Sequence, residues 1–92
     1  MNISVLAGSL SSAPEVRTLK SGDQVVQLQV ATRSAEVVRS VPVSMIDAPA
    51  WLQGLDAGAE VVVLGSVQRR FFSAGGSTGS RTEVVAQETR KA

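Results

Sequence analysis

The sequence predicts a small all-β protein, a five-stranded barrel with one short helix between the third and fourth strands. Three observations favour this fold class. Valine is abundant in the chain, and β-branched side chains pack well on a pleated sheet but lose rotamer freedom in helices. Apolar and polar residues alternate with a period of two, which is typical of half-buried strands. The length of 92 residues suits a single domain, residues 1–92, with a small core.

The first two strands are predicted from the N-terminal third of the chain. Residues 3–10 form the first strand, and a turn-prone cluster ends it at Pro14. Residues 14–19 continue it as a bent or bulged extension. Residues 24–32 form the second strand, in which three buried apolar positions alternate with Gln27 and Gln29.

The third strand and the helix follow in the middle of the chain. Residues 37–46 form the strand, and Pro42 is expected at an edge or bulge because proline cannot donate a ladder hydrogen bond. The helix is predicted over residues 49–55, ending by Gly58. Asp47 is expected to cap it, since an acceptor side chain before a proline is a helix-start signal.

The last two strands are predicted over residues 61–72 and 81–87, joined by a flexible Gly/Ser-rich hairpin loop, residues 73–80. Residues 88–92 form a short basic C-terminal end. Three strands, a short helix and two further strands in this order are the layout of the OB-fold, a partly open Greek-key barrel.

Composition argues against several function classes. The chain has no cysteine, histidine or tyrosine, so the usual nucleophilic and acid–base partners are missing. Its carboxylates are scattered, and no metal, cofactor or small-molecule substrate is expected. The sequence therefore predicts a protein that is not an enzyme. With no secretory leader and no apolar run long enough for a membrane span, a cytoplasmic location is expected.

The strongest functional pattern is Arg69-Arg70-Phe71-Phe72. Cations bind the phosphates of a nucleic-acid strand, and stacking of one base on an aromatic ring contributes about 1–3 kcal/mol. In a strand, Arg70 and Phe72 share one face while the other two side chains share the opposite face. Arg70 and Phe72 are predicted to meet the ligand, whereas Trp51 is predicted to pack at the end of the barrel.

Three further arginines are candidates for phosphate contacts. Two flank the link between the second and third strands, and one stands at the base of the Gly/Ser loop. The net charge of +1 is low for a nucleic-acid-binding protein, but the distribution of charge matters more than its sum. The predicted nucleic-acid-binding residues are Arg33, Arg39, Arg70, Phe72 and Arg81.

The residues as a set resemble the bacterial single-stranded DNA-binding proteins. The matching segments are Val5-Leu-Ala-Gly8-Ser-Leu10, Pro14-Glu-Val-Arg17, Gly22, Val30-Ala-Thr32, Gly58-Ala-Glu-Val61, Gly65, Arg70-Phe-Phe72 and Thr82-Glu-Val-Val85. The resemblance implies an OB-fold that self-associates, often as a tetramer built from two dimers, and coats single-stranded DNA without strong sequence preference. Phe72 stands where the family carries a tryptophan, and other family tryptophans are missing. The family also usually carries a long flexible tail with an acidic tip, and this sequence stops at Arg90-Lys91-Ala92. The resemblance therefore implies a short paralogue without the acidic C-terminal tail, or else a chain from which that tail was trimmed.

The predicted function is sequence-nonspecific binding of single-stranded DNA in replication, repair or recombination, through phosphate contacts and limited base stacking. The alternative is an OB-fold protein-interaction or assembly module with weak or no DNA binding, which the low net charge and missing tryptophans favour. RNA stays open as a ligand, because only contacts to the 2′-OH separate it from DNA. A dimer or tetramer is expected, because the uncharged first strand is an edge that tends to pair with a copy of itself.

Overall fold

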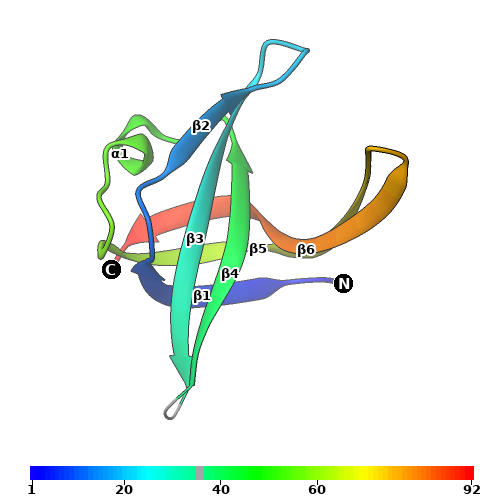
Figure 1. Ribbon diagram of the computed structural model, residues 1–92. Coiled ribbons are helices and arrows are strands. Elements are labelled where there is room, and N and C mark those ends of the chain that lie inside the picture. The colour runs from blue at the N-terminus through cyan, green and yellow to red at the C-terminus, as the bar shows by residue number, and fades with distance from the viewer. Residues whose placement is uncertain (35–36) are drawn as a thin grey trace.

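A computed structural model describes residues 1–34 and 37–92, and it describes the side chains of these residues except those of residues 34 and 72–74. The elements in this part of the chain are β1 (Ser4–Leu10), β2 (Glu15–Thr18), β3 (Gln24–Ser34), β4 (Val37–Ile46), α1 (Ala50–Gln53), β5 (Glu60–Ala74) and β6 (Ser77–Lys91). Figure 1 shows β3 and β4 crossing β1, β5 and β6, with α1 at one end of the barrel.

Five strands close into a barrel in the order β1-β5-β6-β4-β3, and a short pairing of β3 with β1 completes the ring. Among the strand pairs of the described residues, β4 and β6 run parallel and the others are antiparallel. β2 pairs with β3 along the same edge that β1 uses, opposite to the edge that pairs with β4. β1 and β2 together therefore correspond to the bent first strand that the sequence predicts. The helix lies between the third and fourth barrel strands, which confirms the predicted OB-fold.

A glycine permits the ring to close. Ser9 and Leu10 of β1 pair with Ala31 and Val30 of β3. A Cβ atom added at Gly8 would collide with the backbone carbonyl of Ala31. Because only glycine lacks that atom, the residue lets the two strands approach each other where the barrel closes.

The core is made of the inward side chains of the strands. In β3, Val26, Leu28 and Val30 are buried while Gln29 is exposed, as the period of two predicts. The helical turn adds the fully buried Leu52. The remaining core members are Leu10, Val43, Met45, Val61, Val63, Val84 and Ala86. Trp51 is partly buried against this core, in agreement with its predicted packing role.

The helix is shorter than predicted and begins differently. It is a single turn that starts after Pro49, and no side chain caps it. Asp47 has a positive φ of 55°, a left-handed conformation that aspartate tolerates better than most residues. This turn of the backbone lies two residues before the N-cap, so the prediction that Asp47 caps the helix is wrong.

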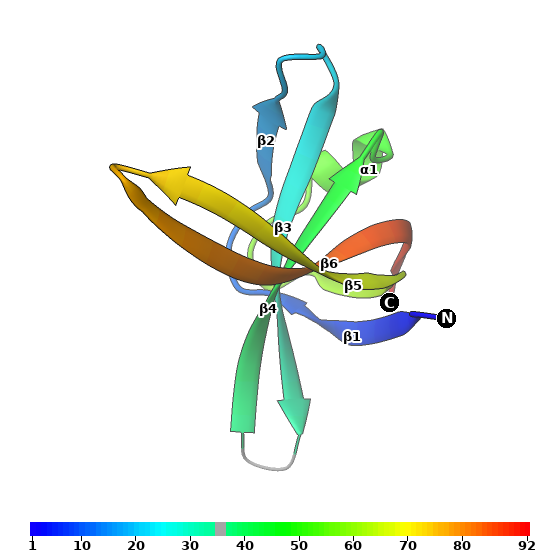
Figure 2. The same ribbon diagram turned by 90° about the vertical axis from the view of Figure 1, so that its right-hand side faces the viewer.

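The predicted hairpin loop over residues 73–80 is mostly strand. β5 and β6 pair as far as Ala74 and Ser77, so the turn consists of Gly75 and Gly76 alone. Both glycines have positive φ, 59° and 85°, as the favoured two-residue hairpin turn requires. The predicted basic end, residues 88–92, also differs, because β6 continues to Lys91 opposite Val61. Figure 2 shows the resulting β5–β6 hairpin extending well beyond the barrel.

Pro42 lies opposite Gln29 in the regular β3–β4 ladder, without a bulge. The Gln29 carbonyl accepts a hydrogen bond from the Ser11 N–H at 2.9 Å, so it faces away from β4. The nitrogen of Pro42 therefore faces away from β3, towards β6, whose ladder with β4 starts one residue later, at Val43. The position is an edge, so the missing N–H leaves no ladder bond unmade.

Candidate nucleic-acid interface

The outer face of the barrel carries the polar side chains of four neighbouring strands. Across β3 and β4, Gln27 pairs with Ser44; across β5 and β6, Arg70 pairs with Arg81. In OB-folds, the second and third barrel strands and the adjoining loops bind oligonucleotides. Here those strands are β3 and β4, and the β5–β6 hairpin supplies one of the loops.

Two predicted site residues, Arg70 and Arg81, meet at a common carboxylate. Arg70 Nε donates a hydrogen bond to Glu83 Oε1, and Arg81 Nη2 donates to Glu83 Oε2 at 3.4 Å. The side chain of Glu83 is 2% exposed, whereas those of Arg70 and Arg81 are 55% and 48% exposed. The three groups therefore form a cluster with one excess positive charge, and its guanidinium groups reach the solvent.

Beside this cluster lies a cavity of about 230 Å³, which we call the arginine cleft. Arg17 of β2, Arg70 and Arg81 line it together with aliphatic side chains. The aliphatic residues are Leu19, Val25, Ile46 and Val85. The volume is below the roughly 300–1,000 Å³ typical of sites for drug-sized ligands. Cations around a small apolar surface suit a phosphate with its neighbouring base.

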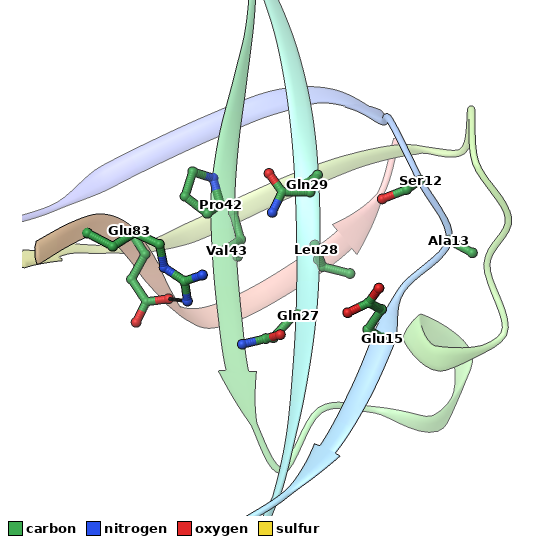
Figure 3. A pocket seen from close by; sticks show the side chains of 10 residues that line it. Ser12, Ala13, Glu15, Gln27, Leu28, Gln29, Pro42, Val43 and Glu83 are labelled. Carbon is green, nitrogen blue, oxygen red and sulfur yellow. Dashed lines mark hydrogen bonds and ion pairs between the residues drawn. The ribbon is translucent and has the colours of Figure 1, made fainter. Parts of the chain in front are cut away.

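A second, more polar hollow adjoins the cleft. Gln27, Arg81 and Glu83 line both cavities, so the two lie side by side on the outer face of the barrel. Figure 3 shows Gln27 and Gln29 on β3, with Glu83 beyond β4 on one side and Glu15 on the other. The outer face thus carries a polar path that crosses the two strands.

The structure separates Arg33 and Arg39 from the arginine cleft. Arg33 pairs with Val38, and Arg39 pairs with Thr32, so the two arginines occupy neighbouring rungs and opposite faces of the β3–β4 hairpin. Arg33 lines a different hollow, beside Gly8 and Glu60. A nucleic-acid strand bound in the cleft would have to extend beyond it to contact either arginine.

The two phenylalanines lie on the β5–β6 hairpin. Phe72 stands opposite Gly79, and its side chain is outside the described part of the structure. Phe71 stands opposite Ser80, on the other face, and is 77% exposed. The alternation along the strand had already indicated that Arg69 and Phe71 share a face. The exposed ring of Phe71 is therefore a second candidate for stacking, on the face opposite to Arg70.

Sequence reasoning missed Arg17 and Glu83 as site residues. Arg17 pairs with Val25, which places it on the outer face of the short strand β2. Its sequence signals were its place in the predicted extension of the first strand and in the matching segment Pro14-Glu-Val-Arg17. Glu83 had a signal, because the predicted last strand put it on the same face as Arg81. Its contact with Arg70 depends on the pairing of two strands, which periodicity within one strand cannot give.

The described residues offer neither a metal site nor a membrane-spanning helix. They contain no group of three or more histidine, cysteine or acidic side chains that could hold a metal ion. In the same part of the chain, no helix is long and apolar enough to cross a membrane.

An OB barrel whose outer face combines arginines with an apolar cleft is typical of oligonucleotide-binding proteins. The sequence model of the Single-strand binding protein family matches residues 1–91, nearly the whole chain. The chain therefore belongs to this family, whose members are DNA-binding proteins and not enzymes. Membership supports single-stranded DNA binding as the general activity. A search of curated proteins gives no match.

Proposed function

We propose that this protein binds single-stranded DNA without sequence preference, through phosphate contacts and few stacked bases, in replication, repair or recombination. The observation that carries the proposal is the arginine cleft. Arg17, Arg70 and Arg81 line one cavity from three different strands, and aliphatic side chains line the same cavity. Phosphates can contact the guanidinium groups while a base lies against the apolar surface.

The chemistry of the cleft supports the lack of sequence preference. Contacts to phosphates position a nucleic acid but carry no sequence information. The aliphatic surface offers no hydrogen bonds by which one base could be distinguished from another. A protein with these contacts acts as a binding protein without enzymatic activity. We place it in the cytoplasm, because it has to share a compartment with the DNA it coats.

We further propose that the protein is a homo-oligomer, a dimer or tetramer, assembled through β1. One edge of β1 is paired with β5 from Ser4 to Ser9, but the other edge pairs with β3 at Ser9 and Leu10 only. Ile3 and Val5 are 64% and 63% exposed beside the free edge. An apolar, unpaired strand edge favours pairing with a second copy of the same strand.

Fluorescence anisotropy with labelled oligo-dT at low and moderate salt tests the DNA-binding proposal. We expect binding at low salt, with the logarithm of affinity falling by roughly 0.7 per neutralised phosphate for each unit of log salt. Arg17→Gln should reduce this slope, since Arg17 lines the cleft and makes no ion pair with any described residue. Arg90→Gln is the matched control, because Arg90 pairs with Glu88 away from the cleft.

The outcomes separate the candidate ligands. Binding of oligo-U as tight as that of oligo-dT would show that the cleft does not exclude RNA. An oligomer that binds neither strand at low salt would contradict the proposal and favour the protein-interaction module.

A further inference from the structure

Of the charged residues whose side chains the structure describes, Glu83 is the one that is buried. Burying a carboxylate is costly unless cations or hydrogen bonds compensate for its lost hydration. Both carboxylate oxygens of Glu83 accept hydrogen bonds from arginines. The acid is therefore an integral part of the surface at which the phosphates are proposed to bind.

The strand pairing explains why an acid is placed there. Arg70 and Arg81 are direct cross-strand partners, an arrangement in which like charges repel. Glu83 lies two residues from Arg81 on the same face, and its own cross-strand partner is Gln68. It is therefore diagonal to Arg70 and adjacent to Arg81, so it relieves the repulsion between them.

The contacts leave part of each guanidinium group available. Arg70 donates to Glu83 through Nε, so this contact leaves both of its terminal nitrogens available. Arg81 donates through Nη2 alone. With about half of each arginine side chain exposed, a phosphate can approach the remaining N–H groups. That phosphate then shares the arginines with the carboxylate.

We infer that Glu83 is a built-in competitor of the DNA phosphates. It holds Arg70 and Arg81 side by side in the arginine cleft and neutralises one of their two charges. This inference rests on the proposed function and adds a residue that sets the affinity. It implies that the cluster interacts with a strand as one cation, which keeps binding weak enough for the strand to be exchanged.

Glu83→Gln tests the inference, because it removes the charge and keeps the shape and one hydrogen-bond acceptor. We expect oligo-dT to bind about threefold to tenfold more tightly at low salt, from the Coulomb energy of one charge a few ångströms from a phosphate in water. The slope of log affinity against log salt should steepen by roughly 0.7. Asp56→Asn, an equal change of net charge at an exposed turn residue outside the cleft, should leave both quantities unchanged.

A rescue experiment separates competition from a merely structural role. Arg70→Gln leaves Arg81 paired with Glu83, a neutral cluster, so the slope should become shallower by roughly 0.7. Adding Glu83→Gln restores one excess positive charge, and the double variant should regain the wild-type slope. If Glu83 were only structural, the double variant would bind more weakly than Arg70→Gln.

Folding is followed by circular dichroism, and Glu83→Ala is a second charge-removing variant from which a steeper slope is also expected. An unchanged or shallower slope in both Glu83 variants, or a failed rescue, overturns the inference.

Inorganic tripolyphosphate, an anion without bases, distinguishes failure of this inference from failure of the proposed function. If the wild-type protein does not bind oligo-dT, the proposed function is wrong. Tripolyphosphate should still raise the melting temperature of Glu83→Gln more than that of the wild type, and an equal rise would refute competition.

Discussion

The side-chain amide of Asn2 takes the place of a backbone peptide opposite Val67. Asn2 Nδ2 donates to the Val67 carbonyl at 2.6 Å, and the Val67 N–H donates to Asn2 Oδ1 at 3.1 Å. The backbone pairing of β1 with β5 ends at Ser4 and Gly65, and Asn2 and Val67 are each two residues beyond that pair, in the same register. Asn2 therefore extends the β1–β5 ladder by one rung, at the place where β5 leaves the barrel and the arginine-bearing hairpin begins.

Replacing Asn2 tests the importance of this rung. Asn2→Ala removes both hydrogen bonds, and we expect the free energy of unfolding in urea to fall by about 1 kcal/mol, the usual net value for an exposed pair. Hydrogen exchange at the Val67 amide should accelerate. Asn2→Asp is the informative partner variant, since its carboxylate can still accept from the Val67 N–H but cannot donate to the carbonyl. If both variants protect the Val67 amide as well as the wild type does, the rung has no role in stability.

Gly8 is expected to be the least replaceable residue of β1. Its added Cβ would collide with the Ala31 carbonyl at the closing pair of the barrel. Gly8→Ala must shift β1 away from β3, and overpacking of this kind costs about 1–3 kcal/mol. Thermal denaturation measures the loss. Gly54→Ala is the control, because its nearest atom is 3.9 Å away, in ordinary contact. Equal melting temperatures for the two variants would show that the barrel closes without this close approach.

Elements governed by local periodicity were predictable from the sequence. The alternation of Val26, Leu28 and Val30 with Gln27 and Gln29 fixed which face of β3 is buried, and burial follows that pattern. The composition of residues 73–80 predicts a loop, because serine, threonine and glycine are common in both turns and hairpin ends, but the structure has strand there. The true turn is set by the positive φ of Gly75 and Gly76.

The candidate site depended on relations between strands and was less predictable. Arg33 and Arg39 looked like neighbours in the sequence, but their pairing with Val38 and Thr32 puts them on opposite faces. The register of a hairpin, which is set by its turn, decides this. Arg17 and Glu83 enter the cleft only because β2 pairs with β3 and β5 pairs with β6. No spacing within one segment gives those contacts.

Trp51 should report on stability and not on DNA. Its ring packs partly against the core, and Lys91 Nζ lies 5.3 Å from the ring centroid. It lines a hollow with residues of the C-terminal end of β6, and none of the cleft residues lines that hollow. Saturating oligo-dT should therefore change tryptophan emission little while anisotropy detects binding. Trp51→Ala should lower the melting temperature and leave affinity unchanged. Strong quenching on binding would place the strand over the helix instead.

The two phenylalanines distinguish which face of the β5–β6 hairpin meets the bases. Arg70 and Phe72 alternate with Arg69 and Phe71 along β5. A DNA strand whose base stacks on one phenylalanine ring therefore lies on the face of the hairpin opposite to the other ring. The arginine cleft favours the face of Arg70. Phe72→Ala should then weaken oligo-dT binding by about 1–3 kcal/mol, the contribution of one stacked base, with oligomer mass unchanged in light scattering. Phe71→Ala, the matched control, should leave affinity near the wild-type value despite the 77% exposure of its ring. The opposite result would move the bases to the face of Arg69, and the phosphates could then no longer be held by Arg70 and Arg81.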